Sequence, residues 1–94
     1  AILNMTRAMA LEYAPDVRVN CVSPGTVDTD MVRLDADRTG DPAARLAAMA
    51  DYAPLRRMAK PEEIASGILY LASADAAYVT GTSLSIDGGT TAGH

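Results

Sequence analysis

Short oxygen-bearing side chains gather in one segment of this sequence, directly after a short apolar run. Residues 23–30 read Ser-Pro-Gly-Thr-Val-Asp-Thr-Asp, and the β-branched residues Val17, Val19 and Val22 precede them. A strand that ends in a Pro-Gly turn leaves backbone N–H groups and hydroxyls at the carboxyl edge of a sheet. Ligands bind at that edge in open α/β sheets, so this segment is the first candidate for a binding site.

The same residues allow a purely structural interpretation. Pro24-Gly25 is a common turn pair, and Asp28, Thr29 or Asp30 can cap a following helix. For an isolated Ser-Pro-Gly this interpretation is the better one, because such turns are frequent. Capping and ligand contact are also compatible for neighbouring residues, so the segment alone does not decide between them.

A second cluster of oxygens occupies residues 35–41, with Gly40 at the sixth position, as in a calcium-binding loop. The twelfth position is Leu46, where a bidentate Glu is required, and Pro42 interrupts the loop. We therefore interpret the segment from Asp35 to Pro42 as an exposed acidic turn and predict no metal site.

Hydrophobic periodicity predicts the elements that hold these segments. Apolar residues at helical spacing predict a helix over residues 1–14, which Pro15 ends. The apolar run from Val17 to Val22 suits a strand buried on both faces. The remaining predicted elements are a short helix over 43–52, a strong helix from 61 to about 72, a strand over 83–86, a turn at 87–89 and a loose tail over 90–94.

The predicted order is helix, strand, small helices, helix, strand, which is a βαβ arrangement and indicates an α/β fold with parallel pairing. A two-stranded parallel sheet does not stand alone, and the first strand needs another neighbour. The sequence begins with Ala1-Ile2-Leu3, inside an apolar helical pattern and without an initiator Met. We therefore expect these 94 residues to be the C-terminal part of a larger sheet.

Composition excludes several classes of protein. The net charge is −4 and the cations are scattered, which argues against a nucleic-acid partner. No apolar run reaches the roughly 20 residues that a membrane span requires. The single Cys21 cannot form an internal disulfide and is expected to be a small buried hydrophobe, consistent with a cytoplasmic location. Arg56, Arg57 and Lys60 are expected on a solvated face, and His94 is not a candidate catalyst.

Several segments together resemble, in order and at family-like spacing, the C-terminal portion of the short-chain dehydrogenase/reductase family. These segments are Arg18-Val19-Asn20, Ser23-Pro24-Gly25 with Val27 and Thr29, Pro61-Glu62-Glu63-Ile64-Ala65, Leu69-Tyr70-Leu71-Ala72-Ser73, Thr80-Gly81-Thr82 and Asp87-Gly88-Gly89. The resemblance covers essentially the whole chain. It implies a Rossmann-like, doubly wound parallel sheet, in which residues 1–94 form the C-terminal part of a single NAD(P)-binding domain.

The resemblance also implies an activity, namely hydride transfer between a nicotinamide cofactor, NAD or NADP, and a small alcohol or ketone. It places Pro24 and Gly25 against the nicotinamide ring, where Gly25 would let the backbone approach without a Cβ. The backbone of Val27 would pair with the carboxamide. The hydroxyl of Thr29 would contact the carboxamide or a phosphate.

Residues 30–58 would form the substrate lid, and the intact protein would be a homo-oligomer, either a dimer or a tetramer. An apolar lid lining could come from Met31, Leu34, Leu46, Met49 and Leu55, although for any single one of them packing of the lid's own helices is the preferred interpretation.

The family's catalytic Ser and its Tyr-x-x-x-Lys pair precede the matched region, and no catalytic residue is assigned here. The residues four positions after Tyr13, Tyr52, Tyr70 and Tyr78 are Val, Arg, Ala and Thr. The chain alone is therefore predicted to be inactive. The alternative from another class is a non-catalytic interaction or oligomerisation module.

Overall fold

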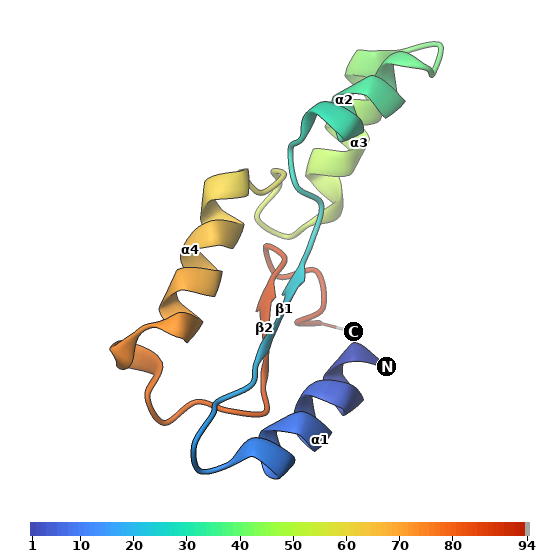
Figure 1. Ribbon diagram of the computed structural model, residues 1–94. Helices are drawn as coiled ribbons and strands as arrows, with labels where there is room; N and C mark the ends of the chain where they lie inside the picture. Colours follow the sequence, from blue (N-terminus) through green and yellow to red (C-terminus); the bar gives the residue numbers. More distant parts are fainter. Residues whose placement is uncertain (94) are drawn as a thin grey trace.

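A computed structural model describes residues 1–93 as five helical segments and two strands (Figure 1). In chain order these are α1 (Ile2–Tyr13), β1 (Cys21–Pro24), α2 (Asp30–Asp37), α3 (Pro42–Tyr52), α4 (Pro61–Ala72), a short 3₁₀ turn η1 (Ala74–Ala76) and β2 (Ser83–Ile86). The predicted α/β order is confirmed, and His94 lies outside the described residues.

The two strands pair in parallel, with Cys21 opposite Ser83 and Pro24 opposite Ile86. The ladder is extended past the end of β1, where the Gly25 N–H donates to the Ile86 carbonyl at 2.9 Å. The long connection through α2, α3 and α4 makes this a βαβ unit. In Figure 1, α4 and α1 lie on opposite sides of the strand pair, and both contact β1.

Helix α4 packs closely against the sheet because it presents a glycine to β2. Pro61 stands in its first turn, as predicted, and Leu71 is buried. A Cβ at Gly67 would collide with the Cδ1 of Ile86. The helix therefore rests with its backbone near the strand whose end borders the candidate site.

The predicted strand from Val17 to Val22 is wrong at its first half, because β1 begins only at Cys21. Upstream of β1, one backbone bond remains, from the Gly81 N–H to the Val19 carbonyl at 2.8 Å, and side chains make the other contacts. The Asn20 Nδ2 donates to the Val79 carbonyl at 3.0 Å, and the Asn20 Oδ1 accepts from the Thr82 N–H at 3.2 Å. These amide contacts hold the two segments together where regular pairing was expected.

The predicted acidic turn from Asp35 to Pro42 is also wrong at its start. Helix α2 continues through Asp37, because Ala36 is fully buried and anchors the last turn of the helix. The turn itself is confined to residues 38–41, where the Thr39 Oγ1 donates to the Ala36 carbonyl at 2.7 Å.

The molecule is elongated, with principal extents of 52 × 26 × 22 Å and a radius of gyration of 16.1 Å. A compact chain of this length would have a radius of about 12 Å. Among residues 1–93, the buried apolar residues are Leu71 and four alanines, whereas large side chains such as Leu11 and Leu69 are 83% and 69% exposed. The described residues thus leave much apolar surface uncovered. No helix within residues 1–93 is both long and apolar enough to cross a bilayer.

Helix α1 is one of the elements whose apolar surface is left uncovered. It buries Thr6 and Ala10, and Ala10 lies against Gly81 of the connection that leads into β2. The predicted apolar stripe, which includes Ile2 and Met5, is exposed instead. The small residues of α1 allow it to approach this connection, and its large residues face away.

Candidate functional site

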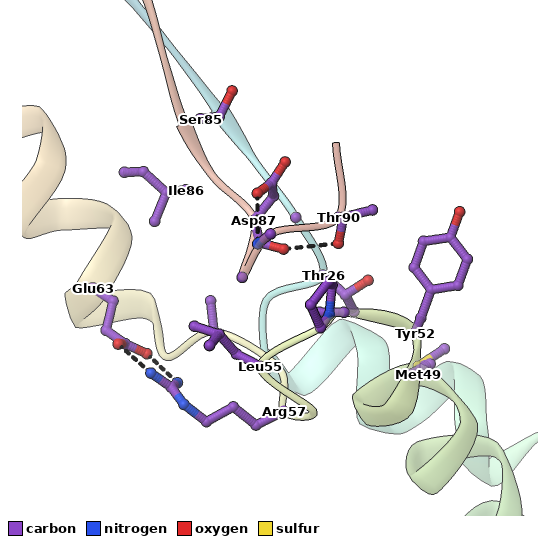
Figure 2. Close-up of a pocket in the computed structure, with 16 residues that line it drawn as sticks. Thr26, Met49, Tyr52, Leu55, Arg57, Glu63, Ser85, Ile86, Asp87 and Thr90 are labelled. Carbon is purple, nitrogen blue, oxygen red and sulfur yellow. Dashed lines mark hydrogen bonds and ion pairs between the residues drawn. The ribbon is translucent and has the colours of Figure 1, made fainter. Parts of the chain in front are cut away.

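A cavity of about 470 Å³ lies at the carboxyl ends of β1 and β2 (Figure 2). Its walls come from the residues that follow both strands, from the end of α3 and the segment after it, and from the first turn of α4. The position agrees with the edge of the sheet that the sequence singled out. Three segments that are distant in the chain therefore meet where a ligand of an α/β protein is expected.

Gly25 lines this cavity. The packing of the protein itself, without any ligand, already requires a glycine at this position. A Cβ at Gly25 would lie 2.9 Å from the Cα of Asp87 and 3.1 Å from its Cβ. The ends of the two strands approach so closely that only glycine fits. This packing constraint exists before any ligand is considered.

Val27 continues the direction of β1 and makes a parallel bridge with Ala59. The Ala59 N–H donates to the Thr26 carbonyl at 2.9 Å, and the Asp28 N–H donates to the Ala59 carbonyl at 2.8 Å. In a parallel bridge of this kind, the bracketed residue directs its own N–H and C=O to the opposite side. Within residues 1–93, neither of these Val27 groups has a hydrogen-bond partner.

Thr29 is the N-cap of α2, since its Oγ1 accepts from the Val32 N–H at 3.2 Å. The capping interpretation is therefore correct for Thr29, and its hydroxyl proton remains available for a further acceptor. Pro24 ends β1 and is exposed. Of the four predicted cofactor residues only Gly25 lines the cavity, while Pro24, Val27 and Thr29 follow the same stretch of backbone between β1 and α2.

The turn after β2 is organised by Asp87, a role that sequence inspection did not assign. Its Oδ1 accepts from the Gly89 N–H at 3.0 Å, and its Oδ2 accepts from the Thr91 hydroxyl at 2.7 Å. The Thr91 hydroxyl bond, with help from backbone N–H groups, lowers the pKa of Asp87. Asp87 is therefore an ionised carboxylate that shapes the turn and the cavity wall. It is not a proton donor at neutral pH.

The end of the predicted lid rests on this turn. The Leu55 N–H donates to the Gly88 carbonyl at 3.0 Å, and the φ angles of Gly88 and Gly89 are 61° and 94°. A Cβ on Gly88 would lie 3.1 Å from Ala53, and one on Gly89 would lie 3.2 Å from Pro54. Two glycines thus form a seat for the segment that leaves α3.

The predicted apolar lining is divided by the structure. Met49 and Leu55 line the cavity, whereas Met31, Leu34 and Leu46 do not. Tyr52, which the sequence analysis did not include in the lining, also borders the cavity. Its neighbour at the i+4 position, Arg56, forms an ion pair with Asp51 and has a positive φ of 58°.

Arg57 and Glu63 form the polar wall of the cavity and make a two-pronged ion pair (Figure 2). The two N–O distances are 2.6 and 2.8 Å. The Glu63 Oε1 also accepts from the Lys60 N–H at 2.9 Å. These bonds, with Arg57 as the larger cause, lower the pKa of Glu63 from 4.5 to about 2.

Arg57 is exposed, as expected, but its pairing with Glu63 was not predicted. The sequence did contain a sign of the role of Glu63. Glu63 lies three residues after Lys60, the N-cap of α4, and a Glu at this spacing is typical of a capping box. Within residues 1–93, no group of three or more His, Cys, Asp or Glu side chains is placed to hold a metal ion.

A parallel βαβ unit with its cavity at the carboxyl edge defines part of a Rossmann-like α/β domain. A family model described as enoyl-(acyl carrier protein) reductase matches residues 1–91. A cis-4-hydroxycyclohexanecarboxylate dehydrogenase from Sinomonas cyclohexanicum is 45% identical over 92 residues, which is 97% of this chain and 34% of the relative. The chain belongs to the short-chain dehydrogenase/reductase family.

Solved structures agree with this assignment. A C-terminal deletion mutant of Thermoplasma acidophilum aldohexose dehydrogenase superposes with a TM-score of 0.91 at 35% identity, over 97% of this chain and 42% of the other. The L-sorbose reductase of Gluconobacter frateurii, complexed with NADPH and L-sorbose, gives 0.87 at 34% identity, over 96% of this chain and 37% of the other. The chain spans about a third of the length of the curated relatives that it matches, 34% to 40% in the first three.

Proposed function

We propose that this chain forms the nicotinamide side of the cofactor site in an NAD(P)-dependent oxidoreductase that acts on small alcohols or ketones. The observation that carries the proposal is the backbone of Val27. Its N–H and C=O lie at the carboxyl edge of the sheet, are fixed by the bridge to Ala59, and are unpaired within residues 1–93. One donor and one acceptor on a single residue match the acceptor and donor of a carboxamide.

The fit between these residues and a nicotinamide cofactor is geometric. The cofactor supplies or accepts the hydride, and the protein must fix the face of its ring and exclude water. A two-point contact through the Val27 backbone would set that face. The Thr29 hydroxyl proton and the exposed Pro24 follow the same stretch of backbone and would complete the contact. The NADPH complex of the related L-sorbose reductase supports a nicotinamide cofactor here.

The proposal divides the work between this chain and residues outside it. No Tyr in the sequence is followed four residues later by Lys, so the family's proton-transfer pair is absent from these 94 residues. The chain would orient the cofactor, cover the substrate with residues 30–58 and contribute to oligomer contacts. It would transfer no hydride alone. The choice between NAD and NADP is left open, and a cytoplasmic location remains our expectation.

A second candidate function, a non-catalytic interaction or oligomerisation module, is favoured by one observation. The large apolar residues of α1 and α4 are exposed within the described residues, including Leu11 and Leu69. In the main proposal these faces are contact surfaces within an enzyme. In the alternative, binding through these faces is the only function of the protein.

The test uses a hybrid enzyme, called the graft, in which residues 1–94 replace the matching segment of the Sinomonas cis-4-hydroxycyclohexanecarboxylate dehydrogenase. We expect the graft to transfer hydride with NAD or NADP, and the isolated chain to show none. In the graft, Val27→Pro removes the N–H donor and is expected to raise the cofactor KM about tenfold. Val27→Ala keeps the backbone donor and is the matched control.

The two variants also separate the candidates. If the graft is inactive although folded, the interaction module is the better reading. If it is active but Val27→Pro and Val27→Ala bind cofactor equally, the role assigned to Val27 is wrong. Turnover by the isolated chain would contradict the division of work between this chain and the residues outside it.

A further inference from the structure

We infer that Glu63 is a positioning residue for the cofactor, because its carboxylate holds the segment against which the Val27 backbone is aligned. The inference rests on the proposed function and adds to it a residue in the first turn of α4. Glu63 belongs to a different element from Val27, and residues 57–60 link the two through five hydrogen bonds.

Glu63 binds both flanks of Ala59. On one side, its two carboxylate oxygens accept from Arg57, at 2.6 and 2.8 Å. On the other side, its Oε1 accepts from the Lys60 N–H at 2.9 Å. One carboxylate therefore fixes the residues that lie two positions before Ala59 and immediately after it.

Ala59 in turn brackets Val27. Its N–H donates to the Thr26 carbonyl and its carbonyl accepts from the Asp28 N–H, at 2.9 and 2.8 Å. Ala59 thus fixes the Thr26 carbonyl and the Asp28 N–H, the backbone groups on the two sides of Val27. A shift of Ala59 rotates the Val27 peptide groups and misaligns the donor and acceptor that the cofactor would meet.

The pair between Arg57 and Glu63 differs in this respect from the other two ion pairs among residues 1–93. All three pairs join residues five or six positions apart, and Asp28 of the Arg33–Asp28 pair follows Val27 itself, but of the three only Arg57–Glu63 holds a residue beside Ala59. Exposed pairs of that kind contribute little to stability. The side chains of Arg57 and Glu63 are 51% and 39% exposed, so their ordinary contribution to stability is also small. Because this pair holds the segment on either side of Ala59, it affects the alignment of the Val27 backbone even though it contributes little to the free energy of unfolding.

The test is made in the graft with Glu63→Gln, which keeps an oxygen acceptor for the Lys60 N–H but weakens the fork to Arg57. We expect the cofactor KM to rise about three- to tenfold with little change in kcat, as for loss of alignment in one hydrogen bond. Arg57→Lys keeps the charge and loses the fork, and is expected to act in the same direction. Glu62→Gln makes the same change at the neighbouring exposed carboxylate in the first turn of α4, which does not line the cavity, and is the matched control, with no expected change.

A second cofactor separates positioning from general loosening. The analogue 3-acetylpyridine adenine dinucleotide keeps the carbonyl but lacks the amide N–H donors, so it cannot make the full contact with Val27. The Glu63→Gln penalty should be smaller with the analogue than with the natural cofactor. An equal penalty with both cofactors, or the same penalty in Glu62→Gln, would overturn the inference.

The outcomes also separate the inference from the proposed function. If Val27→Pro raises the cofactor KM and Glu63→Gln and Arg57→Lys do not, only the inference fails. If Val27→Pro has no effect relative to Val27→Ala, the proposed function fails as well. If Glu63→Gln does not fold, the Arg57→Lys variant carries the same comparison between cofactors.

Discussion

Gly25 illustrates how one residue can satisfy two requirements. Its family resemblance places it against a nicotinamide ring, whereas the structure places its missing side chain 2.9 Å from the Cα of Asp87. The neighbouring atoms belong mainly to backbone, which cannot move aside as a flexible side chain can. Glycine is therefore required at this position because the ends of the two strands lie so close together.

We predict that Gly25→Ala destabilises the fold even without cofactor, by about 1–3 kcal/mol, which is the usual range for overpacking. The measurement is the urea midpoint of the graft in the absence of ligand. Gly40→Ala is the matched control, because nothing lies within 4 Å of a Cβ at Gly40. Equal midpoints for the two variants would show that the strand ends tolerate a methyl group. Contact with the ligand, and not packing, would then be the reason for glycine at position 25.

The Glu63 carboxylate gives a prediction in pH. Its folded pKa is lowered from 4.5 to about 2, chiefly by the Arg57 hydrogen bond. A lowered pKa means that the native state binds the proton less well than the unfolded chain does. The contribution of Glu63 to stability is thus fully present above pH 4.5 and is lost as pH falls toward 2.

We therefore expect the stability difference between the graft and its Glu63→Gln variant to be constant from neutral pH down to about 5 and to shrink below that. Chemical denaturation at pH 7, 5, 4 and 3 measures it. Asp51→Asn serves as the comparison. A difference that grows on acidification would show that folding raises the pKa of Glu63 and does not lower it.

At the scale of elements, the segment before β1 is held by a polar clasp. Arg18 donates to the Val79 carbonyl at 3.0 Å, Asn20 donates to the same carbonyl, and the Val19 N–H donates to the Thr80 hydroxyl at 3.0 Å. These residues form the first of the segments that carry the family resemblance. In the structure they align β1 with the connection that leads into β2.

The clasp predicts that Asn20→Ala destabilises the graft by about 1–2 kcal/mol, since it removes one donor and one acceptor from partly buried partners. Hydrogen exchange should accelerate at the amides of Thr82 and Cys21, which pair across this junction. Asn4→Ala, on the exposed face of α1, is the control. Unchanged exchange at both amides would show that the β1–β2 ladder alone sets the register.

The elements that were predicted correctly are those with local causes. The proline and acidic residues at the start of α4 and the alternation in β2 act over a few residues. The start of β1 was predicted wrongly because its boundary is set by Asn20 and by partners about sixty residues away. The Arg57–Glu63 pair and the bridge from Val27 to Ala59 were not predicted for the same reason. They depend on how α4 is placed against the sheet, which periodicity does not encode.

At the scale of the whole molecule, the main feature is the imbalance between buried and exposed apolar surface. The buried residues are mostly alanines, and a radius of gyration of 16.1 Å exceeds the value of about 12 Å expected for a compact chain of this length. Within residues 1–93, each strand also has a neighbour on one side only. Unpaired strand edges and uncovered apolar faces promote association.

We predict that the isolated chain self-associates in a concentration-dependent manner, as measured by sedimentation velocity. Met5→Lys combined with Leu11→Lys should reduce association, because these residues are 58% and 83% exposed on α1. Arg38→Glu, at the end of α2, is a charge-changing control away from that face. A monomer with strongly protected β1 amides would contradict this prediction and would show that the described residues suffice for a stable fold.

The α2–α3 hairpin projects from the sheet (Figure 1), and both of its roots are fastened to the body of the molecule. The root before α2 is fastened by Ala59, and the root after α3 sits on Gly88 and Gly89. Under the proposed function, residues 30–52 could therefore vary in sequence, and with them the substrate that is accepted, while both anchoring points stay constant. Selectivity could then change during evolution with the cofactor contacts left intact.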